Sequence, residues 1–132
     1  MAESPQTKTA GAIKAGRGLF VFDVGSLNKI AAGPDYSTAH GPVIEGDRTM
    51  VGLMRFPKGT GGKLHSHPNE QWIYVMEGTI EGSIDKLKVR APTGSIIFIP
   101  ANALHEFCAT ADRDVVFFTA KDNAHSIHGI KA

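Results

Sequence analysis

The chain has 132 residues, a length that suits one domain able to bury about two thirds of its unfolded surface. Lys and Arg number 14 and Asp and Glu number 13, so the formal charge is +1 and no strong field recruits nucleic acid or an anionic membrane. The expected partner is therefore a small-molecule substrate.

Cysteine usage and hydropathy point to the cytoplasm. The single cysteine, Cys108, has no partner for an internal disulfide, and the N-terminus shows no basic segment followed by an apolar run and a cleavage site. The longest apolar run, residues 95–100, is strand-sized and far below the roughly 18 residues of a membrane span. We expect a cytoplasmic protein without a membrane segment.

The N-terminal third is irregular. Residues 1–16 are rich in Ala, Thr, Lys and Gly with almost no large apolar group, so we predict a mobile N-terminal arm over 1–16 and a single domain over 17–132. Residues 18–24 have the aromatic and β-branched composition of a strand. Residues 25–46 contain two Gly-Pro pairs and predict a long connection.

Regular β patterning begins after residue 48. Short β-rich runs alternate with Pro, Gly, Asn and Asp breakers, and no segment shows a helical period over a useful length. Many short strands at this spacing predict an all-β barrel or sandwich. The predicted strands are residues 49–56, 63–67, 71–76, 79–84, 87–90, 95–99, 104–109 and 114–120.

Two of these strands are apolar on both faces. Residues 95–99 read Ser-Ile-Ile-Phe-Ile and residues 115–118 read Val-Val-Phe-Phe. One face of each strand packs inside the barrel, and the other needs a second sheet or a second subunit to cover it. This pattern favours a homodimer.

Two histidines form the first half of a candidate metal site. His65 and His67 are two residues apart, so on a strand they project from the same face about 7 Å apart at the backbone. Neutral imidazole suits zinc, nickel, iron, copper and, less tightly, manganese or cobalt. A pair of ordinary surface or core histidines is the alternative. His105 lies on a later predicted strand that can present a third imidazole to the same pocket.

The spacing around these histidines resembles the cupin superfamily. Its first motif reads Gly, five residues, His-x-His, three or four residues, Glu, six residues, Gly. In this sequence Gly59, His65, His67, Gln71 and Gly78 fall in register, with Gln71 at the acidic position.

The second cupin motif is also present. Gly94, Pro100 and His105 match, while Asn102 stands where glycine is usual and Ala109 where asparagine is usual. Asn is the non-glycine residue that best tolerates positive φ, so the Asn102 change is mild. The resemblance covers about residues 48–120 and implies a double-stranded β-helix, or jelly-roll barrel, forming a single cupin domain.

Carried over position by position, the resemblance implies one divalent transition metal (Mn, Fe, Ni, Zn or Co) held by His65, His67, Gln71 and His105. Glu70 is the nearby carboxylate that could compete, but residues 70 and 71 point to opposite strand faces and the motif register favours Gln71. Glu70 is our candidate catalytic base; a metal-bound hydroxide and a histidine outside the ligand set are the alternatives.

A neutral amide at position 71 leaves the +2 charge of the ion uncompensated by its ligands, which makes the ion a stronger Lewis acid. Cupins with glutamine at this position include metal-binding hydroxynitrile lyases and uronate-processing enzymes. Met54 and Phe56 on one strand, and Phe107 with the parity of His105, are the expected substrate-pocket walls, whereas Trp72 and Tyr74 have the opposite parity to Gln71.

Three functions fit these patterns. The first is a metal-dependent lyase or isomerase acting on a small carbonyl- or hydroxyl-bearing substrate. The second is a mononuclear Fe(II) dioxygenase that cleaves a C–C bond of a diketone or phenolic compound. The third is a non-catalytic cupin that binds a sugar or another small ligand.

Overall fold

The computed structural model describes residues 7–132, and in them the only helical element is the short 3-10 helix η1 (Val24–Ser26). All other regular elements are strands. In chain order these are β1 (Ile13–Lys14), β2 (Ile30–Ala31), β3 (His40–Gly41), β4 (Val43–Glu45), β5 (Thr49–Phe56), β6 (His65–Ser66), β7 (Gln71–Glu77), β8 (Thr79–Ile84), β9 (Leu87–Pro92), β10 (Ile96–Ile99), β11 (His105–Ala109), β12 (Val115–Asp122) and β13 (Ile130–Lys131).

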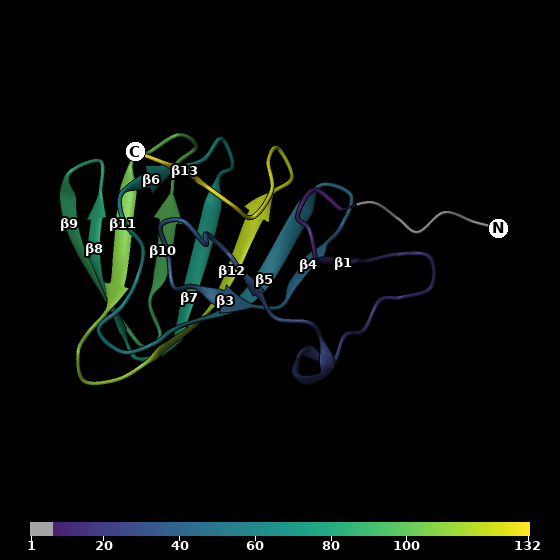
Figure 1. Ribbon diagram of the computed structural model, residues 1–132, viewed down its shortest axis with the longest axis horizontal. Helices are drawn as coiled ribbons and strands as arrows, with labels where there is room; N and C mark the ends of the chain where they lie inside the picture. The colour runs from purple at the N-terminus through teal and green to yellow at the C-terminus, as the bar shows by residue number, and fades with distance from the viewer. Residues whose placement is uncertain (1–6) are drawn as a thin grey trace.

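The strands form two sheets (Figure 1). The larger sheet has the order β1-β4-β5-β12-β7-β10, with β3 pairing β5 and β2 pairing β3, and the smaller sheet has the order β13-β6-β11-β8-β9. Neighbouring strands are mostly far apart in sequence, as when β12 inserts between β5 and β7. This arrangement confirms the predicted all-β jelly roll.

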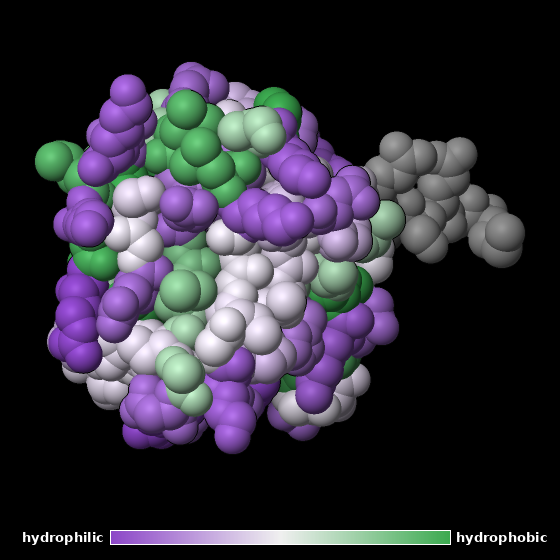
Figure 2. Space-filling model, turned by 60° about the vertical axis from the view of Figure 1, so that its left-hand side comes forward, coloured by the Kyte–Doolittle hydropathy of each residue, from purple (hydrophilic) through white to green (hydrophobic). Residues whose placement is uncertain are grey.

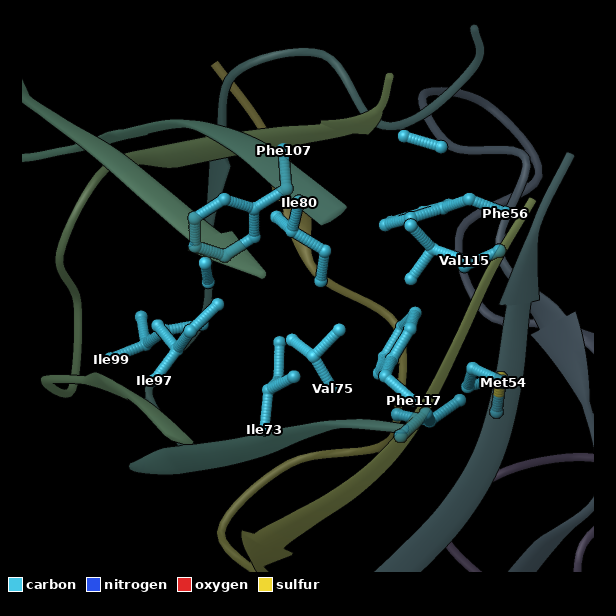
Figure 3. Packing of buried hydrophobic residues seen from close by; sticks show 14 of the residues in the cluster. Met54, Phe56, Ile73, Val75, Ile80, Ile97, Ile99, Phe107, Val115 and Phe117 are labelled. Atoms are coloured by element: carbon cyan, nitrogen blue, oxygen red, sulfur yellow. The ribbon is translucent and has the colours of Figure 1, made fainter. Parts of the chain in front are cut away.

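The hydrophobic core lies between the two sheets (Figure 3). Alternation along each strand turns one residue in two inward. On β7, Ile73 and Val75 are buried while Trp72 and Tyr74 are exposed. Met54, Phe117 and other inward residues of β5 and β12 extend the same core. The parity expected from the sequence for Trp72 and Tyr74 is therefore confirmed.

The motif glycines occupy backbone positions that favour glycine. Gly59, Gly78 and Gly94 have φ values of +70°, +79° and +92°, in the left-handed region that residues with a Cβ rarely adopt. Asn102 occupies the same region with φ +65°. This finding confirms that asparagine can replace glycine at this position of the second motif.

Residues 1–16 were expected to form a mobile arm. Residues 1–6 lie outside the described residues, but residues 7–16 are docked on the larger sheet. β1 pairs in parallel with β4, and Thr9 is fully buried. The backbone N–H of Thr9 donates to Glu45 Oε2, and Thr9 Oγ1 accepts from Ile127 N–H, so hydrogen bonds rather than apolar burial hold this segment.

The strand predicted over residues 18–24 is wrong. Gly16, Arg17 and Gly18 all have positive φ and turn the chain away from the sheets, so Phe20 and Val21 are left 77% and 88% exposed. The eight strands predicted from residue 49 onward all form, with ends that differ by at most a few residues. The expected connection over 25–46 carries the short strands β2, β3 and β4; β3 and β4 pair with β5, and β2 pairs with β3.

The side of the molecule that carries β8, β9 and β11 comes forward in Figure 2, where hydrophilic residues surround a paler centre. Within residues 7–132 no helix has the length and apolarity needed to cross a membrane.

Candidate metal centre

Three histidines gather between the two sheets. His65 and His105 are direct partners across β6 and β11, and His67 follows two residues after His65. The ring centroids of His65 and His105 are 4.2 Å apart, those of His67 and His105 are 4.9 Å apart, and those of His65 and His67 are 6.2 Å apart. The smaller sheet thus brings the predicted imidazoles into one cluster.

Each imidazole is held from behind by a backbone carbonyl. The Nδ1 atoms of His65, His67 and His105 lie 2.7, 2.9 and 2.9 Å from the carbonyl oxygens of residues 63, 69 and 103. A carbonyl oxygen can only accept, so each Nδ1 carries the ring proton and donates it. Each Nε2 is left with an unprotonated lone pair, which is the form of imidazole that binds a metal.

The side-chain amide of Gln71 is oriented in the same way. Its Nε2 donates to Thr119 Oγ1 at 2.8 Å. The Thr119 hydroxyl donates its only proton to the carbonyl oxygen of Trp72 at 2.9 Å, so it can only accept from Gln71. The carboxamide oxygen of Gln71 is therefore the atom that faces His67 Nε2, at 2.9 Å. Two lone-pair-bearing atoms thus face each other in a buried place, an arrangement that a cation stabilises.

Burial keeps the histidines neutral. It lowers the pKa of His67 to about 4, with a further contribution from the positive charge of Lys121, and it lowers the pKa of His105 to about 3, with a further contribution from His65. The pKa of His65 is also lowered, first by burial. At neutral pH the cluster therefore offers three uncharged imidazoles.

The donor set fits a divalent transition metal, although the side chains as they stand do not converge on one point. Among residues 7–132 no three His, Cys, Asp or Glu side chains are arranged to hold an ion. The fourth donor is the amide oxygen of Gln71, which contacts His67 Nε2. The donors are those that such an ion prefers: three imidazole nitrogens and one amide oxygen, each with its orienting hydrogen bond in place.

A cavity of about 60 Å³ opens beside this cluster. His65, Gln71 and His105 line it, whereas His67 is buried behind them. The residues expected to form the pocket are all in its wall: Met54, Phe56 and Phe107. The remaining walls come from both sheets, the loop before β3 and the C-terminal segment: Ala32, Tyr36, Ser37, Ala39, Gly62, Ile73, Phe117, Thr119, Lys121 and Ile127.

Lys121 and Tyr36 are polar residues of the cavity wall that the sequence analysis did not predict. Lys121, near the end of β12, is 5% exposed and donates from Nζ to the carbonyl oxygen of Ile127 at 2.8 Å; burial lowers the pKa of its amine to about 7. The ring of Tyr36 lies 4.3 Å from that of His65, and burial raises the pKa of its phenol. Lys121 is two residues after Thr119 and therefore faces the same side of the strand. Extending the predicted strand from residue 120 to residue 121 would have placed Lys121 on the inward face.

The structure does not bring Glu70 to the site. Its side chain is exposed and absent from the cavity wall, because Gln71 takes the inward position on β7 and adjacent strand residues face opposite ways. We therefore do not retain Glu70 as the catalytic base. Cys108, the single cysteine, is exposed and is also absent from the cavity wall.

The C-terminal segment closes the cluster from one side. β13 pairs with β6, so that Lys131 is opposite His65. Gly129 N–H donates to the Tyr36 hydroxyl at 2.5 Å, and Ile127 is 3% exposed in the cavity wall. Ile127 and Gly129 of the C-terminal segment thus belong to the site.

A two-sheet jelly roll with a histidine cluster and an apolar cavity between its sheets is the architecture of a small ligand- or metal-binding β-barrel protein. The family model described as "Cupin domain" matches residues 52–121, more than half of the chain, and this protein belongs to the cupin family. A search of curated proteins finds no significant match.

Solved structures support the fold. An RmlC-like cupin from Shewanella frigidimarina is similar with a TM-score of 0.67 and 20% identity over 80% of this chain and 90% of that chain. KdgF from a Halomonas species gives a TM-score of 0.54 and 23% identity over 59% and 72% of the two chains. The polyketide cyclase RemF from Streptomyces resistomycificus gives 0.53 and 23% over 58% and 55%.

Proposed function

We propose that this protein is a metal-dependent cupin enzyme of lyase or isomerase type that acts on a small substrate bearing a carbonyl or hydroxyl group. His65, His67, His105 and Gln71 would hold one divalent transition metal. The bound ion would act as a Lewis acid that polarises a substrate oxygen.

One observation carries the proposal. His67 Nε2 and Gln71 Oε1 face each other at 2.9 Å. The N–H at Nδ1 of His67 donates to the Asn69 carbonyl, and the NH₂ group of Gln71 donates to Thr119, so neither residue has a proton between the two facing atoms. A buried contact between two acceptors is unfavourable unless a cation or a proton lies there. The low pKa of His67 disfavours the proton, so a metal ion is the better occupant.

The residues of the cavity wall have roles that do not depend on a bound metal. Phe56, Phe107 and Phe117 keep bulk water away from the reacting atoms and strengthen local electrostatic interactions. The Tyr36 hydroxyl accepts from Gly129 N–H and keeps its own proton, because burial raises its pKa. Tyr36 is thus the wall residue suited to donate a hydrogen bond to a substrate oxygen.

The neutral amide at position 71 favours Lewis-acid chemistry over oxygen activation. With three imidazoles and one amide as ligands, no ligand charge would stabilise a ferric or higher oxidation state. An Fe(II) dioxygenase and a non-catalytic binding protein remain the competing functions, and the test below separates all three.

The test begins with elemental analysis of natively purified protein and titration with Co²⁺ followed by visible absorption. We expect one metal per chain, and loss of about 10- to 100-fold or more in affinity for His105→Ala. Turnover of a panel of β-hydroxy ketones and hydroxy acids is then compared with and without dioxygen. We expect metal-dependent conversion that does not require dioxygen.

His125→Ala is the matched control, because His125 is a neighbouring histidine outside the proposed ligand set. It should bind Co²⁺ like the parent protein. Iron at one per chain together with dioxygen-dependent turnover would favour the dioxygenase. Retention of ligand binding after metal removal and in His65→Ala would favour the non-catalytic protein.

A further inference from the structure

A lysine amine is buried inside the cavity. Lys121 lies opposite Gln71 in the pairing of β12 with β7, and it is the one lysine among the buried side chains of residues 7–132. Its Nζ has three N–H donors when protonated and two when neutral, and the carbonyl oxygen of Ile127 accepts one of them at 2.8 Å. Donors therefore remain for a ligand in the cavity that Lys121 lines.

Within residues 7–132 no carboxylate contacts this amine; the negative charge of the adjacent Asp122 raises its pKa, but burial outweighs that effect. The cavity wall described above contains no Asp or Glu, and none of the ion pairs within residues 7–132 includes Lys121. The adjacent Asp122 is turned to the outside, where its carboxylate accepts from the backbone N–H groups of Glu70 and Ala124. A buried ammonium group that no carboxylate contacts directly is unfavourable.

The proposed metal would increase the imbalance. Three imidazoles and one amide contribute no negative charge, so the +2 of an ion would add to any charge on Lys121 in the same apolar cavity. A ligand that carries a negative charge offsets this imbalance, whereas a neutral ligand of equal shape does not.

Resting on the function proposed above, we propose that the substrate is a small carboxylate with a second oxygen group, a hydroxy acid or a keto acid. Its carboxylate accepts from Lys121 Nζ, and its other oxygen is directed to the cluster of His65, His105 and Gln71. Lys121, His65, His105 and Gln71 all line the same cavity, so one small ligand can contact the amine and the cluster together.

The test compares three probes with the same carbon skeleton: lactate, lactamide and propane-1,2-diol. Each is titrated into Co²⁺-loaded protein at constant ionic strength, and binding is followed by the visible absorption of Co²⁺. A charge-assisted hydrogen bond in a dry site predicts that lactate binds about 10- to 100-fold more tightly than lactamide. Lys121→Met should remove most of this preference, and Lys121→Arg should keep part of it.

Lys88→Met, at an exposed lysine of the other sheet, is the control and should retain the full preference. Thermal unfolding of each variant checks the fold, and Lys121→Gln replaces Lys121→Met if the latter is unfolded.

Equal binding of lactate and lactamide by the parent protein would overturn the inference while leaving the metal site standing. An undiminished preference in Lys121→Met would overturn the role of Lys121. Failure of Co²⁺ to bind at all would remove the proposed function, and with it this inference.

Discussion

At the scale of single residues, the histidine cluster depends on groups that would not touch a metal. Backbone carbonyls fix the proton of each imidazole on Nδ1, and Thr119 fixes the orientation of the Gln71 amide. Outer partners of this kind determine which lone pairs a site offers. Thr119 is therefore as much part of the candidate centre as Gln71.

Thr119→Val should weaken metal binding although it removes no ligand. Without the hydroxyl, the Gln71 amide can rotate and present its NH₂ group to His67, so we expect a loss in Co²⁺ affinity of about 10- to 100-fold. The affinity is measured by competition titration against a chelator. Thr49→Val, on the exposed end of β5, should leave the affinity unchanged; equal effects of both substitutions would contradict this role of Thr119.

The depressed histidine pKa values predict acid sensitivity of the metal-free protein. The pKa values of His67 and His105 are about 4 and about 3 in the folded chain, below the ordinary 6.5 that holds in the unfolded chain. The unfolded chain therefore binds more protons below pH 6.5, and the stability present above pH 6.5 is lost as the pH falls toward these folded values. The expected slope is up to about 1.4 kcal/mol per pH unit for each histidine.

Urea unfolding of the metal-free protein at intervals across this window measures the slope. His105→Gln should reduce it, because one of the two strongly shifted groups is then absent. A free energy of unfolding that is the same at both ends of the window would contradict the prediction.

At the scale of elements, the glycine-rich segment before β6 allows close approach to β11. Gly61 forms a bridge with Cys108, and the adjacent Gly62 N–H donates to the carbonyl oxygen of Phe107 at 2.8 Å. A Cβ on Gly61 would lie 2.0 Å from that carbonyl oxygen. The contact is with backbone, which cannot move aside as a side chain can.

Gly61→Ala should therefore destabilise the fold by about 2 kcal/mol or more and displace β11, which carries His105. Urea unfolding gives the free energy, and Co²⁺ titration reports the effect on the site. Gly25→Ala is the control, because a Cβ there meets only Asp23 Oδ1 at an ordinary 3.5 Å. Wild-type stability of Gly61→Ala would contradict the close approach.

The strands that carry the site could be predicted because alternation and breaker residues act locally. The histidine cluster, Gln71 and the three pocket residues all come from such strands, and the structure brings them together. Tyr36 could not be predicted, because it reaches the cavity from an irregular loop whose path depends on tertiary contacts. The strand prediction for residues 18–24 was wrong because local composition did not decide the structure there. The turn at residues 16–18 overrides the strand composition of this segment.

At the scale of the whole molecule, residues 7–132 leave one broad apolar surface exposed. Exposed apolar side chains lie on the outer face of three neighbouring strands of the larger sheet, β12, β7 and β10. Phe118 and Ile96 are both opposite Tyr74, and the rings of Trp72 and Phe98 are 4.7 Å apart. The cross-strand pairs form a continuous apolar surface, of the kind that marks an interaction site.

We predict that a second copy of this chain covers this surface in a two-fold symmetric dimer. The face is self-complementary in chemistry because aromatic side chains can pack on their own copies, and a formal charge of +1 per chain gives little repulsion. Light scattering after size exclusion should give twice the chain mass, and Phe118→Glu should give the monomer. Leu87→Glu, at an exposed leucine of the smaller sheet, should remain dimeric. A monomeric parent protein, or a dimeric Phe118→Glu, would contradict this interface.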